Sequence, residues 1–229
     1  MDSSKSWYNN YYSRKDKQLK KSWYEGALLL AKRNFPDIHE KRIFEIGTGT
    51  GEFISACESE HVSGIDLSFE AVRKARSYAP HAKMVNSAGE SLPFKANSFD
   101  IVVMCEVIEH VEDPDKVLRE IRHILNDSGH LIISFPNYLH LLYFFIFEMS
   151  ILLNQPKWID RQIVDRILFY PSMKKTLHKH GFSLVDVCGT SYGHQKIPLL
   201  RKLDSYSGTF DKMKLHSLSF HPVLLVQKR

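Results

Sequence analysis

The sequence contains little cysteine, and this bears on the compartment in which the chain folds. Its 229 residues include three cysteines, Cys57, Cys105 and Cys188, and none stands at a metal-binding spacing. So few cysteines, in an odd number, do not build a disulfide framework and are typical of reduced thiols. The first ten residues, MDSSKSWYNN, are polar, so we expect no secretory signal. The sequence therefore predicts a cytoplasmic protein.

No apolar run in the sequence is long enough to span a membrane. The longest, YLHLLYFFIFEMSILLN at 138–154, is interrupted by His140 and Glu148, whereas a spanning helix needs about 20 apolar residues. We therefore expect no transmembrane segment. Three roles stay open for this run: a buried or dimer-forming helix, a lid over a hydrophobic ligand, or a surface in peripheral contact with a membrane.

A strong excess of one charge is also lacking. Lys and Arg number 31 and Asp and Glu number 26, which gives a net charge of +5 spread along the chain. Nucleic-acid binders usually gather their basic residues in one patch, so this distribution disfavours a nucleic-acid partner. No internal repeat or low-complexity linker divides the chain, and 43% of its residues are hydrophobic. We expect a single domain over residues 1–229, with the oligomeric state left open.

What the sequence does contain is an alternation of short apolar, β-rich runs with helix-length segments. The predicted strands are Arg42–Glu45, Val62–Asp66, Lys83–Asn86, Phe99–Met104 and Leu131–Phe135. The predicted helices between them are Glu52–Ser59, Phe69–Tyr78 and Asp115–Leu125. Such alternation predicts an α/β fold, with a mostly parallel, doubly wound, Rossmann-like sheet covered by helices on both faces.

Further segments are expected to surround this core. The chain is expected to divide into an N-terminal helical cap, a ligand-binding core, a helical insertion after the fifth strand, and a C-terminal part, at 1–40, 41–136, 137–170 and 171–229. The last part is predicted to hold a helix at 171–180 and two strands, Ser183–Thr190 and Leu218–Gln227. Two consecutive strands predict an antiparallel hairpin at one edge of the sheet.

Three glycines, Gly47, Gly49 and Gly51, lie between the first predicted strand and the next helix in the segment IGTGTG. Glycine permits a tight turn and lets a ligand touch main-chain atoms, while a helix start offers unpaired N–H groups to an anionic group. Asp66 ends the second strand 19 positions after Gly47, where a carboxylate suits the two hydroxyls of a ribose. The segment therefore predicts an adenosine-like ligand; a purely structural turn is the alternative.

Several segments, in order, point to one class of nucleoside cofactor. The spacing G-x-G-x-G, with Glu52 next, differs from the dinucleotide fingerprint and disfavours a nicotinamide oxidoreductase, and no P-loop motif occurs. The segments FEIGTGTG, GIDLS and AGESLPFKANSFDIVVMCEVIEHVEDPDKVLREIRHILNDSGHLIISFPN together resemble class I S-adenosylmethionine-dependent methyltransferases. The resemblance runs from residue 41 to about residue 137.

The resemblance implies that S-adenosylmethionine is the cofactor. The glycine segment would line its methionine part, Glu45 would lie near its ammonium group, and Asp66 would hold its ribose hydroxyls. The implied cofactor-binding set is Glu45, Gly47, Thr48, Gly49, Gly51, Asp66, Leu67, Ala88, Gly89, Glu90, Cys105 and Glu106. Ala88 stands where relatives often carry an aspartate, so one contact to the adenine amino group is missing.

The segment CEVIEHVEDP offers candidates for the chemistry. Methyl transfer from a sulfonium is an in-line displacement in which the protein chiefly positions the acceptor, but an O–H or N–H acceptor must also lose a proton. Glu106 and His110 are the predicted catalytic residues, stacked four apart if this segment is helical. With Glu109 they could instead hold Mg²⁺, as in the quinone-biosynthesis O-methyltransferases and small-RNA 2′-O-methyltransferases that this segment resembles. A structural role for His110 is the third alternative.

We therefore expect an S-adenosylmethionine-dependent methyltransferase that acts on an oxygen or nitrogen atom of a small molecule. The alternatives are a metal-assisted O-methyltransferase for a catechol-like or RNA hydroxyl, and a non-catalytic partner protein that binds the cofactor. The acceptor pocket is expected in the N-terminal cap, the 137–170 insertion and the 192–215 loop. Tyr8, Tyr11 and Tyr12 are a candidate lid.

Overall fold

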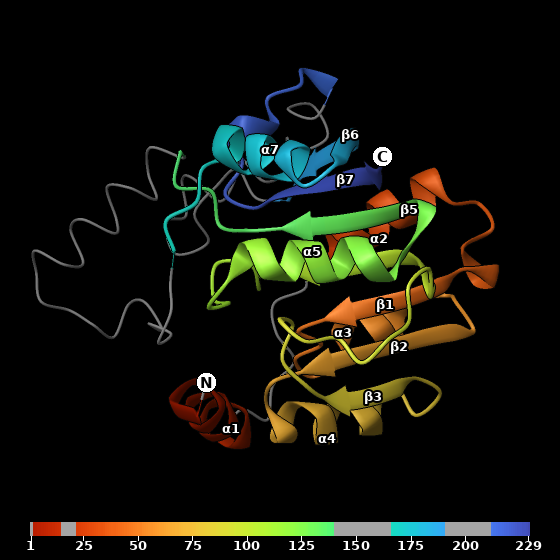
Figure 1. The fold of residues 1–229 in the computed structure, drawn as a ribbon, viewed down its shortest axis with the longest axis vertical. Coiled ribbons are helices and arrows are strands. Elements are labelled where there is room, and N and C mark those ends of the chain that lie inside the picture. Colours follow the sequence, from red (N-terminus) through yellow and green to blue (C-terminus); the bar gives the residue numbers. More distant parts are fainter. Residues whose placement is uncertain (1, 15–21, 140–165, 191–211) are drawn as a thin grey trace, which may run out of the picture.

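The computed structural model describes residues 2–14, 22–139, 166–190 and 212–229, which form a seven-stranded sheet with helices around it (Figure 1). The helices are α1 (Asp2–Arg14), α2 (Ser22–Asn34), α3 (Glu52–Ala56), α4 (Phe69–Tyr78), α5 (Pro114–Ile124) and α7 (Tyr170–Lys179), with 3-10 helices at Ile38–Glu40 and His216–Leu218. The strands are β1 (Arg42–Ile46), β2 (His61–Asp66), β3 (Lys83–Asn86), β4 (Phe99–Cys105), β5 (Leu125–Ser134), β6 (Phe182–Gly189) and β7 (Pro222–Lys228).

The strands lie in the order β3-β2-β1-β4-β5-β7-β6. The first five in this order run parallel, and β7 pairs antiparallel with both β5 and β6. The sheet therefore has the predicted α/β class, with a C-terminal antiparallel hairpin. Its winding reverses between β1 and β4, and ligands of such sheets bind beyond the carboxyl ends of the strands at this point. These ends point to the left in Figure 1.

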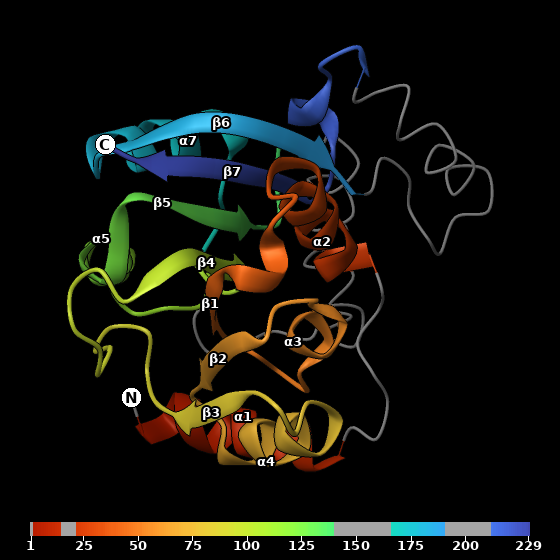
Figure 2. The ribbon, with the colours of Figure 1, turned by 90° about the vertical axis from the view of Figure 1, so that its right-hand side faces the viewer.

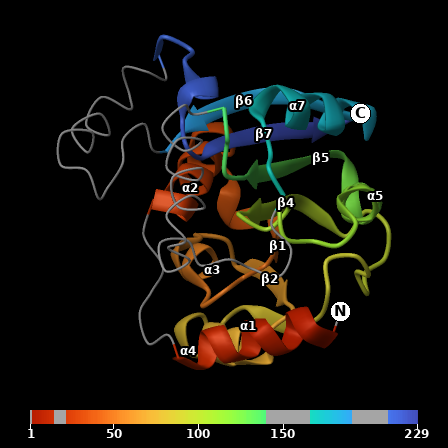
Figure 3. The ribbon, with the colours of Figure 1, turned by 90° about the vertical axis from the view of Figure 1, so that its left-hand side faces the viewer.

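Helices cover both faces of the sheet, so the strands are buried on both sides. Phe44 and Ile46 of β1 pack on the side of α5 and α7, whereas Ile43 packs on the side of α2, α3 and α4. Figure 2 shows these two layers from the amino ends of the parallel strands, and Figure 3 shows them from the carboxyl ends. In both views α1 lies beside α4. The loops at the carboxyl ends are thus held by two packed layers.

Three element boundaries differ from the sequence prediction by three residues or more. The helix predicted to reach Ser59 ends at Ala56, the strand predicted to begin at Leu131 begins at Leu125, and the last strand begins at Pro222 rather than at Leu218. Phe220 is buried like a strand residue, but its carbonyl accepts the main-chain N–H of Asn137 at 2.7 Å instead of bonding to a neighbouring strand. The apolar pattern therefore extends past the strand, and the residues before Pro222 form a turn at the carboxyl edge.

The predicted helical insertion lies largely outside the described residues, since 140–165 are among those left out of the description. The two described ends of this segment lie side by side: Asn137 and Leu168 form a parallel bridge, and Tyr138 donates to the Leu168 carbonyl at 2.9 Å. Within the described ranges no helix is both long and apolar enough to cross a membrane.

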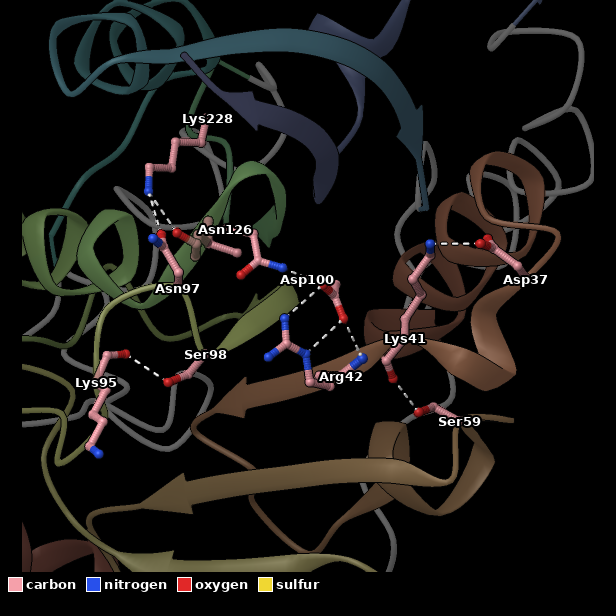
Figure 4. Close-up of polar contacts among 11 residues, drawn as sticks. Asp37, Lys41, Arg42, Ser59, Lys95, Asn97, Ser98, Asp100, Asn126 and Lys228 are labelled. Carbon is pink, nitrogen blue, oxygen red and sulfur yellow. Dashed lines mark hydrogen bonds and ion pairs between the residues drawn. The ribbon is translucent and has the colours of Figure 1, made fainter.

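Polar side chains join several strands at the amino edge of the sheet (Figure 4). Asp100 of β4 accepts the main-chain N–H of Arg42 at 2.8 Å and two guanidinium N–H groups of the same residue at 3.2 and 3.1 Å. The amide of Asn126 also donates to Asp100. Lys228 reaches from β7 to the carbonyl of Leu125 at 2.6 Å. These bonds tie β1, β4, β5 and β7 together at the end away from the glycine segment.

Candidate functional site

The glycine segment after β1 has the left-handed backbone that glycine adopts without strain. The φ angles of Gly47, Gly49 and Gly51 are +75°, +53° and +89°. A Cβ on Gly47 would lie 2.3 Å from a methyl carbon of Val107, and one on Gly51 would lie 3.1 Å from the Cα of Ala75. Side chains at these two positions would therefore push the loop away from the β4–α5 connection and from α4.

Asp66 links this loop to the end of β2. Its carboxylate accepts the main-chain N–H of Gly49 at 2.9 Å and that of Ser68 at 2.8 Å. Burial raises the pKa of Asp66 to about 6, although the two backbone hydrogen bonds oppose the shift. Each carboxylate oxygen can accept a second hydrogen bond. The side chain is thus fixed in place with acceptor capacity left for a hydroxyl-bearing ligand.

Two buried polar atoms beside the loop have no hydrogen-bond partner among the described residues. They are Oε2 of Glu45 and Oγ1 of Thr48, whose residues are 4% and 3% exposed. Burial, followed by the charges of Glu52 and Asp66, raises the pKa of Glu45 well above its ordinary value. Buried polar groups are nearly always satisfied in native proteins. These two atoms therefore indicate a ligand that donates hydrogen bonds, and a cation suits the carboxylate best.

Glu52 is a third acidic residue at this site, and the sequence analysis did not assign it. It is 8% exposed, begins α3 immediately after Gly51, and accepts a hydrogen bond from the hydroxyl of Thr50. Its position in the sequence could have identified it, because Glu52 is an acid in the first turn of the helix that follows a glycine loop.

Helix α1 packs across the start of α4, next to the three acids. Asn9 accepts the hydroxyl of Ser68 at 2.9 Å, and Lys74 donates to the carbonyl of Tyr12 at 2.8 Å. Burial, then the charges of Asp66 and Glu52, raise the pKa of the Tyr12 phenol well above its ordinary value. Of the three tyrosines predicted as a lid, Tyr12 is therefore placed close to the acids.

The residues predicted to flank the adenine ring lie at the ends of β2 and β3. The amide of Asn86 donates to the carbonyls of Asp66 at 2.8 Å and Leu67 at 2.9 Å, which fixes the turn that carries Leu67. Ala88 and Gly89 follow β3, and Glu90 accepts the main-chain N–H of Glu112 at 2.9 Å. The structure thus connects this segment to the β4–α5 connection, and all predicted cofactor residues lie at the carboxyl edge.

Cys105 and Glu106 occupy the end of β4. Burial, then the charges of Glu45 and Glu106, raise the pKa of the Cys105 thiol well above its ordinary value. Glu106 has φ +54°, an uncommon conformation for a residue with a side chain. Its Oε1 accepts the hydroxyl of Ser134 at 2.7 Å, and its Oε2 lies 2.8 Å from Nδ1 of His221. Ser134 and His221 are functional candidates that the sequence analysis did not identify.

The β4–α5 connection is a turn, so the predicted stacking of Glu106 and His110 on a helix is not observed. The turn closes with a hydrogen bond from the His110 N–H to the Val107 carbonyl at 2.9 Å, and α5 begins only at Pro114. Nε2 of His110 lies 3.5 Å from Oε1 of the buried Glu109. In the described part of the chain no group of three or more His, Cys, Asp or Glu side chains is arranged to hold a metal. Among the described residues, the three considered for Mg²⁺ are therefore not arranged as a metal-binding group, and Glu106 contacts His221.

Comparison with known proteins agrees with this geometry. The model of the methyltransferase domain family matches residues 44–133. A probable S-adenosylmethionine-dependent methyltransferase of Mycobacterium tuberculosis is 30% identical over 124 residues, which are 53% of this chain and 45% of that protein. The chain thus spans about half the length of the curated relatives it matches.

Solved structures share the fold over nearly the whole chain. An S-adenosylmethionine-dependent methyltransferase of Thermotoga maritima, described as a possible histamine N-methyltransferase, has a TM-score of 0.66 at 21% identity and covers 90% of this chain and 89% of its own. The 1,6-didemethyltoxoflavin-N1-methyltransferase of Burkholderia thailandensis was solved with 1,6-didemethyltoxoflavin and S-adenosylhomocysteine. It has a TM-score of 0.61 at 14% identity, and the match covers 99% of this chain and 84% of that protein. These matches show that residues 44–133 are similar to the methyltransferase domain family, and that the chain shares the fold of solved S-adenosylmethionine-dependent methyltransferases.

Proposed function

We propose that this protein transfers the methyl group of S-adenosylmethionine to an oxygen or nitrogen atom of a small molecule. The observation that carries the proposal is a group of buried polar side chains at the carboxyl edge with hydrogen-bonding capacity left over. Glu45 and Thr48 keep buried polar atoms without partners in the described residues, and Asp66 keeps free acceptor capacity beside the glycine loop. An ammonium group fits Glu45, and the hydroxyls of a ribose fit Asp66. When bound, S-adenosylmethionine supplies a methyl group on a positively charged sulfur.

The chain's own residues would orient the reactants and keep competing groups inactive. Gly47, Gly49 and Gly51 form a turn of positive φ angles along which the ligand would approach the main chain. Cys105 stays a protonated thiol because burial and three nearby acids raise its pKa, so it does not compete for the methyl group as a thiolate. Glu106 and His110, the predicted catalytic residues, lie at the same edge, within reach of an acceptor placed beyond β4.

Two features support a small molecule with an O–H or N–H group as the acceptor. Carboxylates and histidines gather past β4, and they can take up the proton that such an acceptor loses. In addition, the Thermotoga and Burkholderia proteins carry names that describe N-methylation of small molecules. The predicted parts of the acceptor pocket at 137–170 and 192–215 fall largely outside the described residues, so a hydrophobic acceptor rests on the apolar sequence of 138–154.

A cytoplasmic location belongs to the same proposal. Cys57, Cys105 and Cys188 are all free thiols, and two of them are buried. Unpaired cysteines are typical of reducing compartments. The net charge of +5, spread along the chain, supports a small-molecule partner rather than a nucleic acid.

A radiolabel transfer assay tests the proposal. Purified protein is incubated with methyl-labelled S-adenosylmethionine and with the small-molecule, lipid, protein and RNA fractions of an extract from the source organism, each with and without a chelator. We expect label in the small-molecule fraction, with no effect of the chelator. Label in RNA that disappears with the chelator would favour the metal-assisted alternative. Cofactor binding without any transfer would favour the non-catalytic partner protein.

A further inference from the structure

Three neighbouring strands bring an acid, a hydroxyl and an imidazole together at the carboxyl edge. Glu106 follows the last residue of β4, Ser134 ends β5, and His221 precedes the first residue of β7. Because β7 runs antiparallel to β5, its start lies at the same edge as the ends of β4 and β5. Oε1 of Glu106 accepts from the Ser134 hydroxyl at 2.7 Å, and Oε2 meets Nδ1 of His221 at 2.8 Å.

The position of Glu106 is held from several sides. Its main-chain N–H donates to the Ser134 carbonyl at 3.2 Å, and its side chain is only 9% exposed. Its left-handed backbone is strained for a residue with a side chain, and such strain is often found at functional sites. The Cβ clash that glycine avoids at Gly47 is with Val107, the next residue, so the glycine loop lies directly against this part of the chain.

His221 is held equally firmly from the other side. Its carbonyl accepts the main-chain N–H of Thr190 at 3.2 Å and the Thr190 hydroxyl at 3.0 Å. The fully buried Asn137 donates its amide to the carbonyls of Ser217 at 2.9 Å and Ser219 at 3.1 Å, which anchors the turn before β7. The imidazole is therefore presented by fixed backbone on both sides of it.

The contact with Glu106 decides the tautomer of the imidazole. A carboxylate only accepts hydrogen bonds, so Nδ1 of His221 carries the hydrogen and Nε2 carries the lone pair. A carboxylate that accepts the Nδ1 hydrogen is the arrangement that prepares an imidazole to act as a base at Nε2. His110, by contrast, contacts Glu109 through Nε2 at 3.5 Å.

We propose that His221 is the general base of the methyl transfer, with Glu106 as the residue that positions it. The inference rests on the proposed function. In the step, a lone pair of the acceptor oxygen or nitrogen forms a bond to the methyl carbon while the carbon–sulfur bond breaks, and its electrons neutralise the sulfonium to a thioether. The proton of the acceptor moves to Nε2 of His221, which leaves an imidazolium beside the Glu106 carboxylate. Water later removes that proton.

Charged and titratable groups near the pair have to be considered in a test by pH. Glu106 faces His221 directly, Cys105 precedes Glu106, and the charges of Glu45 and Glu109 reach Cys105 from β1 and from the β4–α5 turn. Cys105 has its pKa raised and carries no charge at neutral pH. Glu106 is thus the acidic group in direct contact with the imidazole of His221.

The test compares variants with methyl-labelled S-adenosylmethionine and the acceptor isolated from the small-molecule fraction. His221→Gln, Glu106→Gln and His110→Gln are assayed from pH 6 to pH 9, with His178→Gln, an exposed residue on α7, as the matched control. We expect His221→Gln to lose about 10²- to 10⁴-fold in kcat and the rising limb of the pH profile. Glu106→Gln should move that limb to lower pH, because the imidazolium loses its counter-charge. His178→Gln should leave the profile unchanged.

Each outcome has a separate meaning. Wild-type kcat in His221→Gln, or loss of the limb in His110→Gln alone, would overturn the assignment and leave the methyltransferase proposal intact. An inactive wild type would remove both. Unfolding midpoints and the Kd for S-adenosylhomocysteine show whether each variant folds. If His221→Gln does not fold, histidine ¹⁵N spectra of the wild type decide: a protonated Nδ1 supports the pair, and an Nε2–H tautomer overturns it.

Discussion

At the amino edge of the sheet Asp100 pairs with a cation, whereas at the carboxyl edge Glu45 lies near two other acids, Glu52 and Asp66. Asp100 bonds to Arg42, and although partial burial opposes it, the hydrogen bonds and charge of Arg42 hold the pKa of Asp100 below its ordinary value. Glu45 and Asp66, at the other end of adjacent strands, have no cation as partner among the described residues, and burial raises the pKa of both.

The difference indicates that the amino edge contributes to the stability of the fold, whereas the carboxyl edge is suited to binding a ligand. Paired charges at the amino edge hold neighbouring strands together, and they are compensated without a ligand. Unpaired acids at the carboxyl edge destabilise the empty protein, since burying an uncompensated carboxylate costs free energy. Such a cost is understandable when a positively charged ligand with hydroxyl groups relieves it. The predictions below test this contrast.

The largest expected effect is a change with pH in the free energy of unfolding that Asp66 contributes. Between pH 3.8 and about 6 the folded state keeps the proton of Asp66 while the unfolded state has lost it. The free energy of unfolding contributed by Asp66 therefore falls as pH rises through this window, by about 3 kcal/mol for a shift of about two pKa units, and stays constant above it. Urea unfolding of the wild type and Asp66→Asn from pH 4 to pH 8 measures the difference. A difference that does not change with pH would contradict the raised pKa.

A methyl group at Gly47 should cost about 3 kcal/mol of stability and most of the cofactor affinity. Its Cβ would lie 2.3 Å from Val107 in a backbone of φ +75°. Overpacking of this kind costs about 1–3 kcal/mol, and the left-handed conformation costs about 1–2 kcal/mol more for a residue with a Cβ. Adding Val107→Ala to Gly47→Ala should restore the steric part only. If the double variant is no better than the single one by urea unfolding, the contact with Val107 is not the cause.

Removal of the charge at Glu45 should selectively weaken binding of the amino-acid part of the cofactor. We expect Glu45→Gln to raise the Kd for S-adenosylhomocysteine about tenfold, because it loses a charge-assisted hydrogen bond to the ammonium group. The Kd for 5′-methylthioadenosine, which has no amino-acid part, should not change. Equal weakening of both ligands in calorimetric titrations would place Glu45 elsewhere in the site.

The smallest effect is expected at the amino edge. Asp100→Asn should lower the free energy of unfolding by about 1 kcal/mol, since it weakens a partly exposed ion pair with Arg42. The Kd for S-adenosylhomocysteine should be that of the wild type. A loss of affinity in this variant would mean that the two edges are coupled and would weaken the contrast.

Much of this site is predictable from sequence because its contacts are local. The carboxylate of Asp66 and the N–H of Gly49 are 17 positions apart, at the end of β2 and in the loop after β1, with a single helix between them. Glycine spacing and a strand-ending acid therefore predict the loop and the acid that it contacts. The strand alternation likewise predicts the parallel sheet and its antiparallel end.

The Glu106–His221 contact could not be predicted from the sequence, because it joins residues that are far apart along the chain. The two residues are 115 positions apart, and they meet only because β7 inserts between β5 and β6 with its start at the carboxyl edge. The prediction that the last strand begins at Leu218 placed His221 inside the strand, whereas it lies in the turn before Pro222. The position of Tyr12 beside Asp66 depends in the same way on the docking of α1 onto α4, which no local pattern encodes.

The most direct test of the account is a pair of calorimetric titrations with S-adenosylhomocysteine, on the wild type and on Asp66→Asn at pH 7.5. Asp66→Asn should weaken binding by about 100-fold or more, since two hydrogen bonds to a charged acceptor contribute about 1.5–3 kcal/mol each. Asp100→Asn, the matched aspartate at the other end of the sheet, should bind as the wild type does. Equal affinity in the wild type and Asp66→Asn would contradict the claim that the unpaired acids of the carboxyl edge hold the cofactor.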